Sequence, residues 1–91
     1  MSEPLRIQQV IHDDSQYQFE VTVGQRRFTV TVHAAYHQKL TNGAIPAEEL
    51  VRLSFEFLLE REPASSILPA FDLPLIGRYF PEYEESIKQM L

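Results

Sequence analysis

The chain has 91 residues, of which 44% are hydrophobic, and a formal net charge of −5 from eight Lys and Arg against thirteen Asp and Glu residues. This length suits one domain with a thin core and is too short for two cores. The acidic balance weighs against a general nucleic-acid-binding protein, and the absence of cysteine excludes disulfides, thiolate metal sites and cysteine nucleophiles.

Two stretches in the first half alternate apolar and polar residues, as half-buried strands do. They are residues 17–23 and 26–33, and only Gly24-Gln25 lies between them, which predicts a hairpin with a type II′ turn. A two-residue turn pairs apolar with apolar and polar with polar residues at every position, so one face is buried. The side chains on that face include Tyr17, Phe19, Val21, Phe28, Val30 and Val32.

Residues 5–12 predict a weaker strand, because Val10 breaks the alternation. Asp13-Asp14-Ser15 has the composition of a turn. We favour a three-residue turn here, which sets Ile7 opposite Val21 and Ile11 beside Tyr17, over a four-residue turn. The result is a three-stranded antiparallel meander whose first and third strands are both edges.

From residue 34 the apolar period changes to that of helices. A short helix is expected over Ala34–Thr41, ended by Asn42-Gly43, and a longer one from about Pro46 to about Glu62. The longer helix has only one narrow polar stripe, so we expect other elements to cover it on more than one side. Two further helices are expected in the tail, the first capped by Asp72 and the second starting near Pro81.

These elements predict an α+β fold in which a three-stranded antiparallel β-meander is followed by helices packed on one face, with a central helix at about 46–62. The whole chain, residues 1–91, forms a single domain in this prediction, with strands at about 4–33 and a helical part at about 34–91. Residues 46–91 hold the whole charge of −5, since they contain four basic and nine acidic side chains.

The C-terminal half resembles a known family. Residues 78–84 read Arg-Tyr-Phe-Pro-Glu-Tyr-Glu, and they follow Ser66-Ile67-Leu68 and Phe71-Asp72-Leu73. This pattern resembles a family of small uncharacterised bacterial proteins that carry the same signature near the C-terminus. The family has no established activity, so the resemblance implies no catalytic or binding residue; it implies a bacterial cytoplasmic setting. The N-terminus shows no signal-peptide pattern, and no apolar run reaches the ~20 residues of a membrane span, which agrees with a cytoplasmic protein.

Catalytic chemistry finds little support in the residues. His33 and His37 have the spacing of two metal ligands on a helix, but we place His33 at a strand end, where solvated histidines are the simpler interpretation. Ser15, Ser54, Ser65 and Ser66 lack the setting of a nucleophile, and the three glycines are too scattered for a phosphate-binding loop. We therefore predict a non-catalytic protein with no catalytic residue, cofactor, metal site or small-molecule substrate.

Nucleic-acid binding is the sharper alternative hypothesis. The outer face of the sheet would present Arg6 and Arg27, with Arg26 at the adjacent turn. Sheets that bind single-stranded RNA place aromatic side chains on that face for base stacking. Here the aromatic residues of the strands fall on the opposite, buried face, so nucleic-acid binding is the weaker prediction.

Protein–protein interaction is the favoured function, as a regulatory or interaction module. Arg78, Tyr79, Phe80 and Tyr83 concentrate residue types that are enriched among interface anchors. The competing interpretation is that these aromatic residues close the far side of the core. The open edge strands and the C-terminal helix are further surfaces that a partner, or a second copy in a homodimer, can use.

Overall fold

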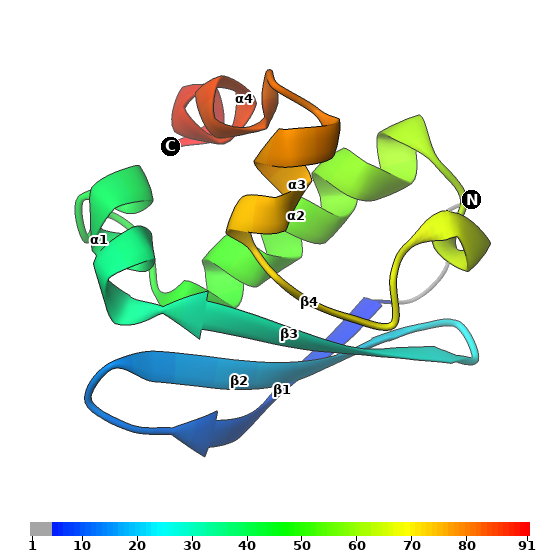
Figure 1. Cartoon of the computed structure of the whole chain (residues 1–91), viewed down its shortest axis with the longest axis horizontal. Coiled ribbons are helices and arrows are strands. Elements are labelled where there is room, and N and C mark those ends of the chain that lie inside the picture. Colours follow the sequence, from blue (N-terminus) through cyan, green and yellow to red (C-terminus); the bar gives the residue numbers. More distant parts are fainter. Residues whose placement is uncertain (1–4) are drawn as a thin grey trace.

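The computed structural model describes residues 5–91, without the side chains of Ile11 and His12, and shows one sheet that carries helices on one face (Figure 1). The predicted start of the strands at residue 4 lies outside the described residues. The elements are β1 (Leu5–His12), β2 (Gln16–Val23), β3 (Arg26–His33), α1 (Ala34–Thr41), α2 (Ala47–Arg61), η1 (Ala64–Ser66), β4 (Ala70–Asp72), α3 (Pro74–Tyr79) and α4 (Tyr83–Met90). The α+β prediction and its central helix are thus confirmed.

The hairpin of β2 and β3 has the predicted register, with Val21 opposite Phe28. Gly24 adopts a φ of 62° and Gln25 keeps a negative φ, the signs that a type II′ turn requires. Asn42, with a φ of 53°, ends α1 in the left-handed conformation, as predicted from Asn42-Gly43.

The predicted register of β1 is correct only for its first half. Ile7 lies opposite Val21 as expected, but Ile11 pairs with Gln18 rather than Tyr17, because the register shifts between Gln9 and Ile11. The shift is a β-bulge at Val10, the residue that breaks the alternation, and the Val10 side chain is exposed. Because of this extra residue, the pairs from Leu5 to Gln9 follow the register of the three-residue turn. The pairs next to the turn follow the register of the four-residue turn.

The sheet has four strands, which corrects the expected three-stranded meander. β4 pairs in parallel with β3, opposite Thr29 to Thr31, so the order is β1-β2-β3-β4. The backbone N–H of Thr29 donates to the Pro69 carbonyl at 2.8 Å, and the N–H of Leu73 donates to the Thr31 carbonyl at 3.1 Å. β3 is therefore not an edge over this stretch, and the C-terminal part, for which only turns and helices were expected, contains a strand.

Asp72 was expected to cap the helix that follows it, and this prediction is wrong. The residue belongs to β4, and the cap position of α3 is Leu73, without a side-chain hydrogen bond to the helix. The Asp72 carboxylate instead lies 3.7 Å from Nε2 of His33 on the neighbouring strand. Because Asp72 pairs with β3, its carboxylate lies beside His33 and does not cap α3.

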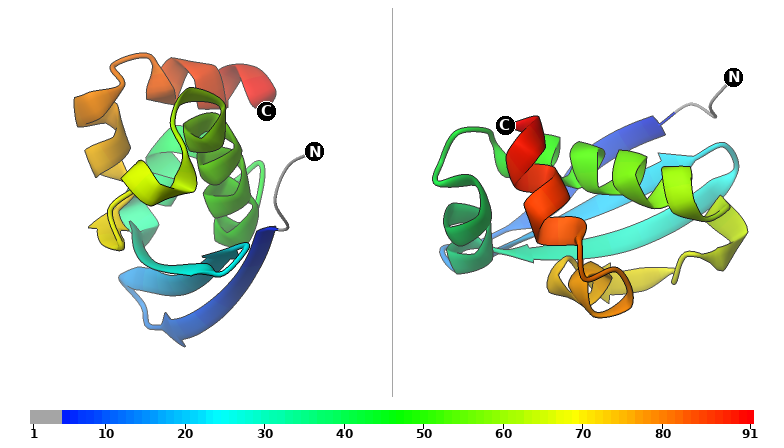
Figure 2. Two further views of the ribbon diagram at one scale, coloured as in Figure 1. Left: turned by 90° about the vertical axis from the view of Figure 1, so that its right-hand side faces the viewer. Right: turned by 90° about the horizontal axis from the view of Figure 1, so that it is seen from above.

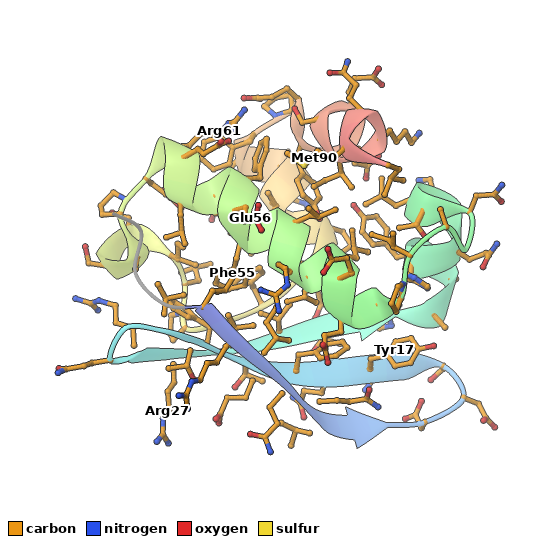
Figure 3. All side chains as sticks on the ribbon, turned by 180° about the vertical axis from the view of Figure 1, so that it is seen from behind. Tyr17, Arg27, Phe55, Glu56, Arg61 and Met90 are labelled. Carbon is orange, nitrogen blue, oxygen red and sulfur yellow. The ribbon has the colours of Figure 1, made fainter. Side chains whose placement is uncertain are left out.

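The central helix α2 lies between the sheet and α4 (Figures 1 and 2). Phe55 lies on the side of α2 that faces the sheet (Figure 3). Its ring packs against those of Phe28 and Phe71, at centroid distances of 5.4 and 6.0 Å. Toward α4, the ring centroid of Phe57 is 5.3 Å from that of Tyr83. Other elements thus cover α2 on two sides, as its narrow polar stripe predicted.

Candidate functional site

The predicted partner-binding residues fall in three different environments. Arg78 and Tyr79 are exposed on α3, and 66% of the Tyr79 side chain is in solvent. Phe80 is half-buried, with its ring edge-on to Phe57 at a centroid distance of 5.8 Å. Tyr83 is fully buried, so its assignment to an interface is corrected: it belongs to the core between α2 and α4.

Tyr79 and Phe80 line an apolar hollow of about 400 Å³, which we call the α3 hollow. It opens between the C-terminal end of α2, η1, β4 and α3. Its rim is in water, since Leu68 is 46% exposed, whereas its floor is buried at Leu58 and Ile76. The lining residues are Leu58, Glu62, Ser66, Ile67, Leu68, Phe71, Leu75, Ile76, Tyr79 and Phe80.

Most residues of the α3 hollow could not be identified from the sequence. Leu68 and Phe71 lie in a turn-rich stretch without a helical or strand period, and they join Tyr79 only through the pairing of β4. The one available signal was Leu68 itself, an apolar residue between two turn segments. The structure therefore extends the Tyr79–Phe80 prediction to a surface made of four segments.

The polar groups of the α3 hollow are Glu62 and Ser66 at its edge. Arg61, next to Glu62 in sequence, is directed elsewhere: its guanidinium carbon lies 3.6 Å from the centre of the Phe57 ring. Its Nε also donates to the Glu82 carboxylate at 3.3 Å. Within residues 5–91, no ion pair engages the Glu62 carboxylate.

The outer face of the sheet holds the arginines of the nucleic-acid hypothesis. Arg6 and Arg27 flank Thr22 in one row across β1, β2 and β3. The Arg27 side chain extends away from the helices (Figure 3). Both arginines line a second hollow of about 590 Å³, together with Leu5, Ile7, Gln8, Glu20, Thr22 and Arg52. Arg26 is exposed but does not line it, and Arg52 is paired with Glu49 at 3.2 Å.

The aromatic side chains of these strands lie on the inner face, as predicted. Phe19 and Phe28 are buried in the core, and Tyr17 is partly buried against it. The outer arginine row therefore has no strand aromatic beside it among the residues that the structure describes, and a stacking platform for bases is missing there.

His33 and His37 lie in separate surroundings. His33 faces Asp72, whereas Nε2 of His37 lies 2.6 Å from the carbonyl oxygen of Ile45 and the His37 ring stands edge-on to Tyr17. Over the described residues no group of three His, Cys, Asp or Glu side chains is arranged to hold a metal ion.

Two tyrosines have strongly raised pKa values. The pKa of Tyr36 is raised by burial and by the neighbouring Tyr83. The hydrogen bond that the Tyr36 hydroxyl donates to the Glu84 carboxylate, at 2.9 Å, raises it further. Burial, together with the nearby Glu84 carboxylate, also raises the pKa of Tyr83. Both phenols are therefore held neutral in the fold, and neither faces the α3 hollow.

Comparison of the chain with protein-family models, with curated proteins and with solved structures finds no match. The family resemblance of residues 78–84 therefore stays a prediction. Within the described part of the chain, no helix combines the length and apolar character needed to cross a lipid bilayer.

Proposed function

We propose that this protein is a small, non-catalytic interaction module that binds a protein partner through the α3 hollow. The observation that carries the proposal is the hollow itself: about 400 Å³ lined mostly by apolar side chains, with Leu68 and Tyr79 exposed at its rim. Exposed apolar surface around a concave site, with a polar edge, is typical of binding surfaces. Tyrosine is a common anchor because its ring packs while its hydroxyl stays hydrated.

The buried surroundings make the α3 hollow a preformed site. Phe80 packs against Phe57 of α2, Ile76 is buried in the core, and Phe71 belongs to β4 of the sheet. Because these elements are fixed by the core, a partner does not have to order the surface before it binds. The proposal includes a bacterial cytoplasmic setting, which the lack of cysteine and the family resemblance support.

A selection of peptides from a random displayed library on the immobilised protein tests this function. The selected peptides are then measured on Leu68→Ser and Tyr79→Ala, with Met90→Ser as the matched control, since Met90 is also 46% exposed and lies outside the hollow. We expect both hollow variants to lose binding and the control to keep it. Failure to select any peptide, or equal binding by all variants, contradicts the proposal.

Binding of single-stranded nucleic acid is the second candidate, because Arg6, Arg27 and Arg52 surround one hollow on a chain that is otherwise acidic. This candidate is weaker than protein binding, because Arg52 is paired with Glu49 and because the aromatic residues of the strands lie on the inner face. Fluorescence anisotropy with labelled single-stranded RNA and DNA, at several salt concentrations, tests it. Salt-dependent binding that is lost in Arg6→Gln and Arg27→Gln supports this candidate.

A homodimer stays a further proposal about partners. β1 is a free edge of the described sheet, but its bulge at Val10 interrupts the regular pairing that a second copy needs. Multi-angle light scattering at micromolar concentration measures the mass directly, and a dimer that persists in the two hollow variants points to β1 or α4.

A further inference from the structure

The charge around the α3 hollow is one-sided. Glu62 is the charged side chain among the described lining residues, and it is half-buried at the C-cap of α2. The nearest cation in sequence, Arg61, is occupied by the Phe57 ring, the Phe57 carbonyl and Glu82. The structure therefore leaves a carboxylate at the edge of an apolar site without a cation from the described chain.

Two further features make this end of the molecule negative. The C-terminal end of α2 borders the hollow through Leu58 and Glu62, and the carboxyl end of a helix carries a partial negative charge that favours cations. Residues 56–91, which form the hollow and the helices behind it, contain seven acidic and three basic side chains. Such a field attracts cationic partners and repels anionic ones, including an acidic lipid surface.

From this complementarity we infer that the partner segment carries an apolar anchor residue flanked by lysine or arginine. The anchor enters the hollow between Leu68 and Tyr79, and the cation meets Glu62. This inference rests on the proposed function and adds the chemistry of the partner. Charge complementarity across an interface fixes orientation and rejects wrong partners, so acidic segments with the same anchor are excluded.

The peptide selection distinguishes this inference from the function on which it rests. We expect peptides that depend on Leu68 and Tyr79 to be enriched in Lys or Arg within a few residues of a large apolar residue. Glu62→Gln is expected to weaken them by about threefold to tenfold and Glu62→Lys by more. Glu85→Lys makes the same charge change on α4, on an exposed residue outside the hollow, and is expected to stay within about twofold of wild type.

The failures separate clearly. Selected peptides that need Leu68 and Tyr79 but lack basic residues, and that bind Glu62→Lys as well as wild type, overturn the inference and leave the function standing. No hollow-dependent peptide at all overturns the function. A dimer in light scattering that dissociates in Tyr79→Ala shows that a second copy occupies the hollow, which also overturns the inference.

Discussion

The hydrogen bonds between α2 and α4 make an asymmetric prediction for two conservative substitutions. The Ser54 hydroxyl donates its single hydrogen to the Leu50 carbonyl at 2.7 Å. The Tyr83 hydroxyl, 2.6 Å from the Ser54 oxygen, must therefore be the donor in that bond. Both side chains are fully buried, so a hydroxyl that loses its partner there finds no water.

The expected free energies of unfolding follow from this geometry. Ser54→Ala leaves the Tyr83 hydroxyl buried without an acceptor, which costs ~1–3 kcal/mol, offset by up to ~0.5 kcal/mol from the better helix propensity of alanine. Tyr83→Phe removes the hydroxyl itself and leaves Ser54 bonded to Leu50, so its cost is ~0.5–1.5 kcal/mol. In the Tyr83→Phe background, Ser54→Ala orphans no donor and should cost close to nothing.

Urea unfolding of the four proteins, followed by circular dichroism at pH 7, measures these differences. We expect Ser54→Ala to be the least stable single variant and the double variant to resemble Tyr83→Phe, with unchanged denaturant slopes. Losses that simply add in the double variant would show that the two hydroxyls do not interact, and would refute the assigned donor and acceptor.

Three further predictions concern the core, the outer face and alkaline pH. Phe57→Ala, which empties the space between α2, Phe80 and Tyr83, should cost ~3–5 kcal/mol in a thermal or urea melt; a melt within a few degrees of wild type would contradict the central place of α2. Arg27→Ala should change stability by no more than ~0.5 kcal/mol, and a large loss would mean that the sheet faces are reversed. Unfolded tyrosine ionises near pH 10, whereas the raised pKa of Tyr36 and of Tyr83 keeps both phenols neutral in the folded protein. The free energy of unfolding should therefore be constant below about pH 10 and fall above it, less steeply in Tyr36→Phe. Urea melts at pH 8 and 11 test this.

The sequence was sufficient for the β2–β3 hairpin and for the end of α1, which depend on local pattern. Alternation set the β2–β3 register, and Asn42-Gly43 set the end of α1. The inner position of Phe19 and Phe28 followed from the same alternation. These features need only contacts between residues that are close along the chain or joined by a tight turn.

The parts that could not be predicted depend on pairing between distant residues. β4 has only three residues, and nothing in Ala-Phe-Asp indicates that it pairs in parallel with Thr29 to Thr31. Because β4 was not predicted, Asp72 was assigned a capping role and β3 was taken to be an edge strand. It also concealed the α3 hollow, because Phe71 and Leu68 reach Tyr79 only once that strand is in place.

The predicted binding residues show how far composition can go. The cluster from Arg78 to Tyr83 was predicted from composition to bind a partner, yet composition does not separate the exposed Tyr79 from the buried Tyr83. That distinction comes from α4, whose first residue turns toward Ser54 and Phe57.

The most direct measurement for the central proposal is a map of backbone amide chemical shifts, recorded on the ¹⁵N-labelled protein while a hollow-dependent peptide is added. We predict that the largest changes occur at Leu68, Phe71, Tyr79 and Phe80 and that the outer sheet face is unaffected. Changes centred on Arg6, Thr22 and Arg27 instead would contradict the α3 hollow as the contact surface.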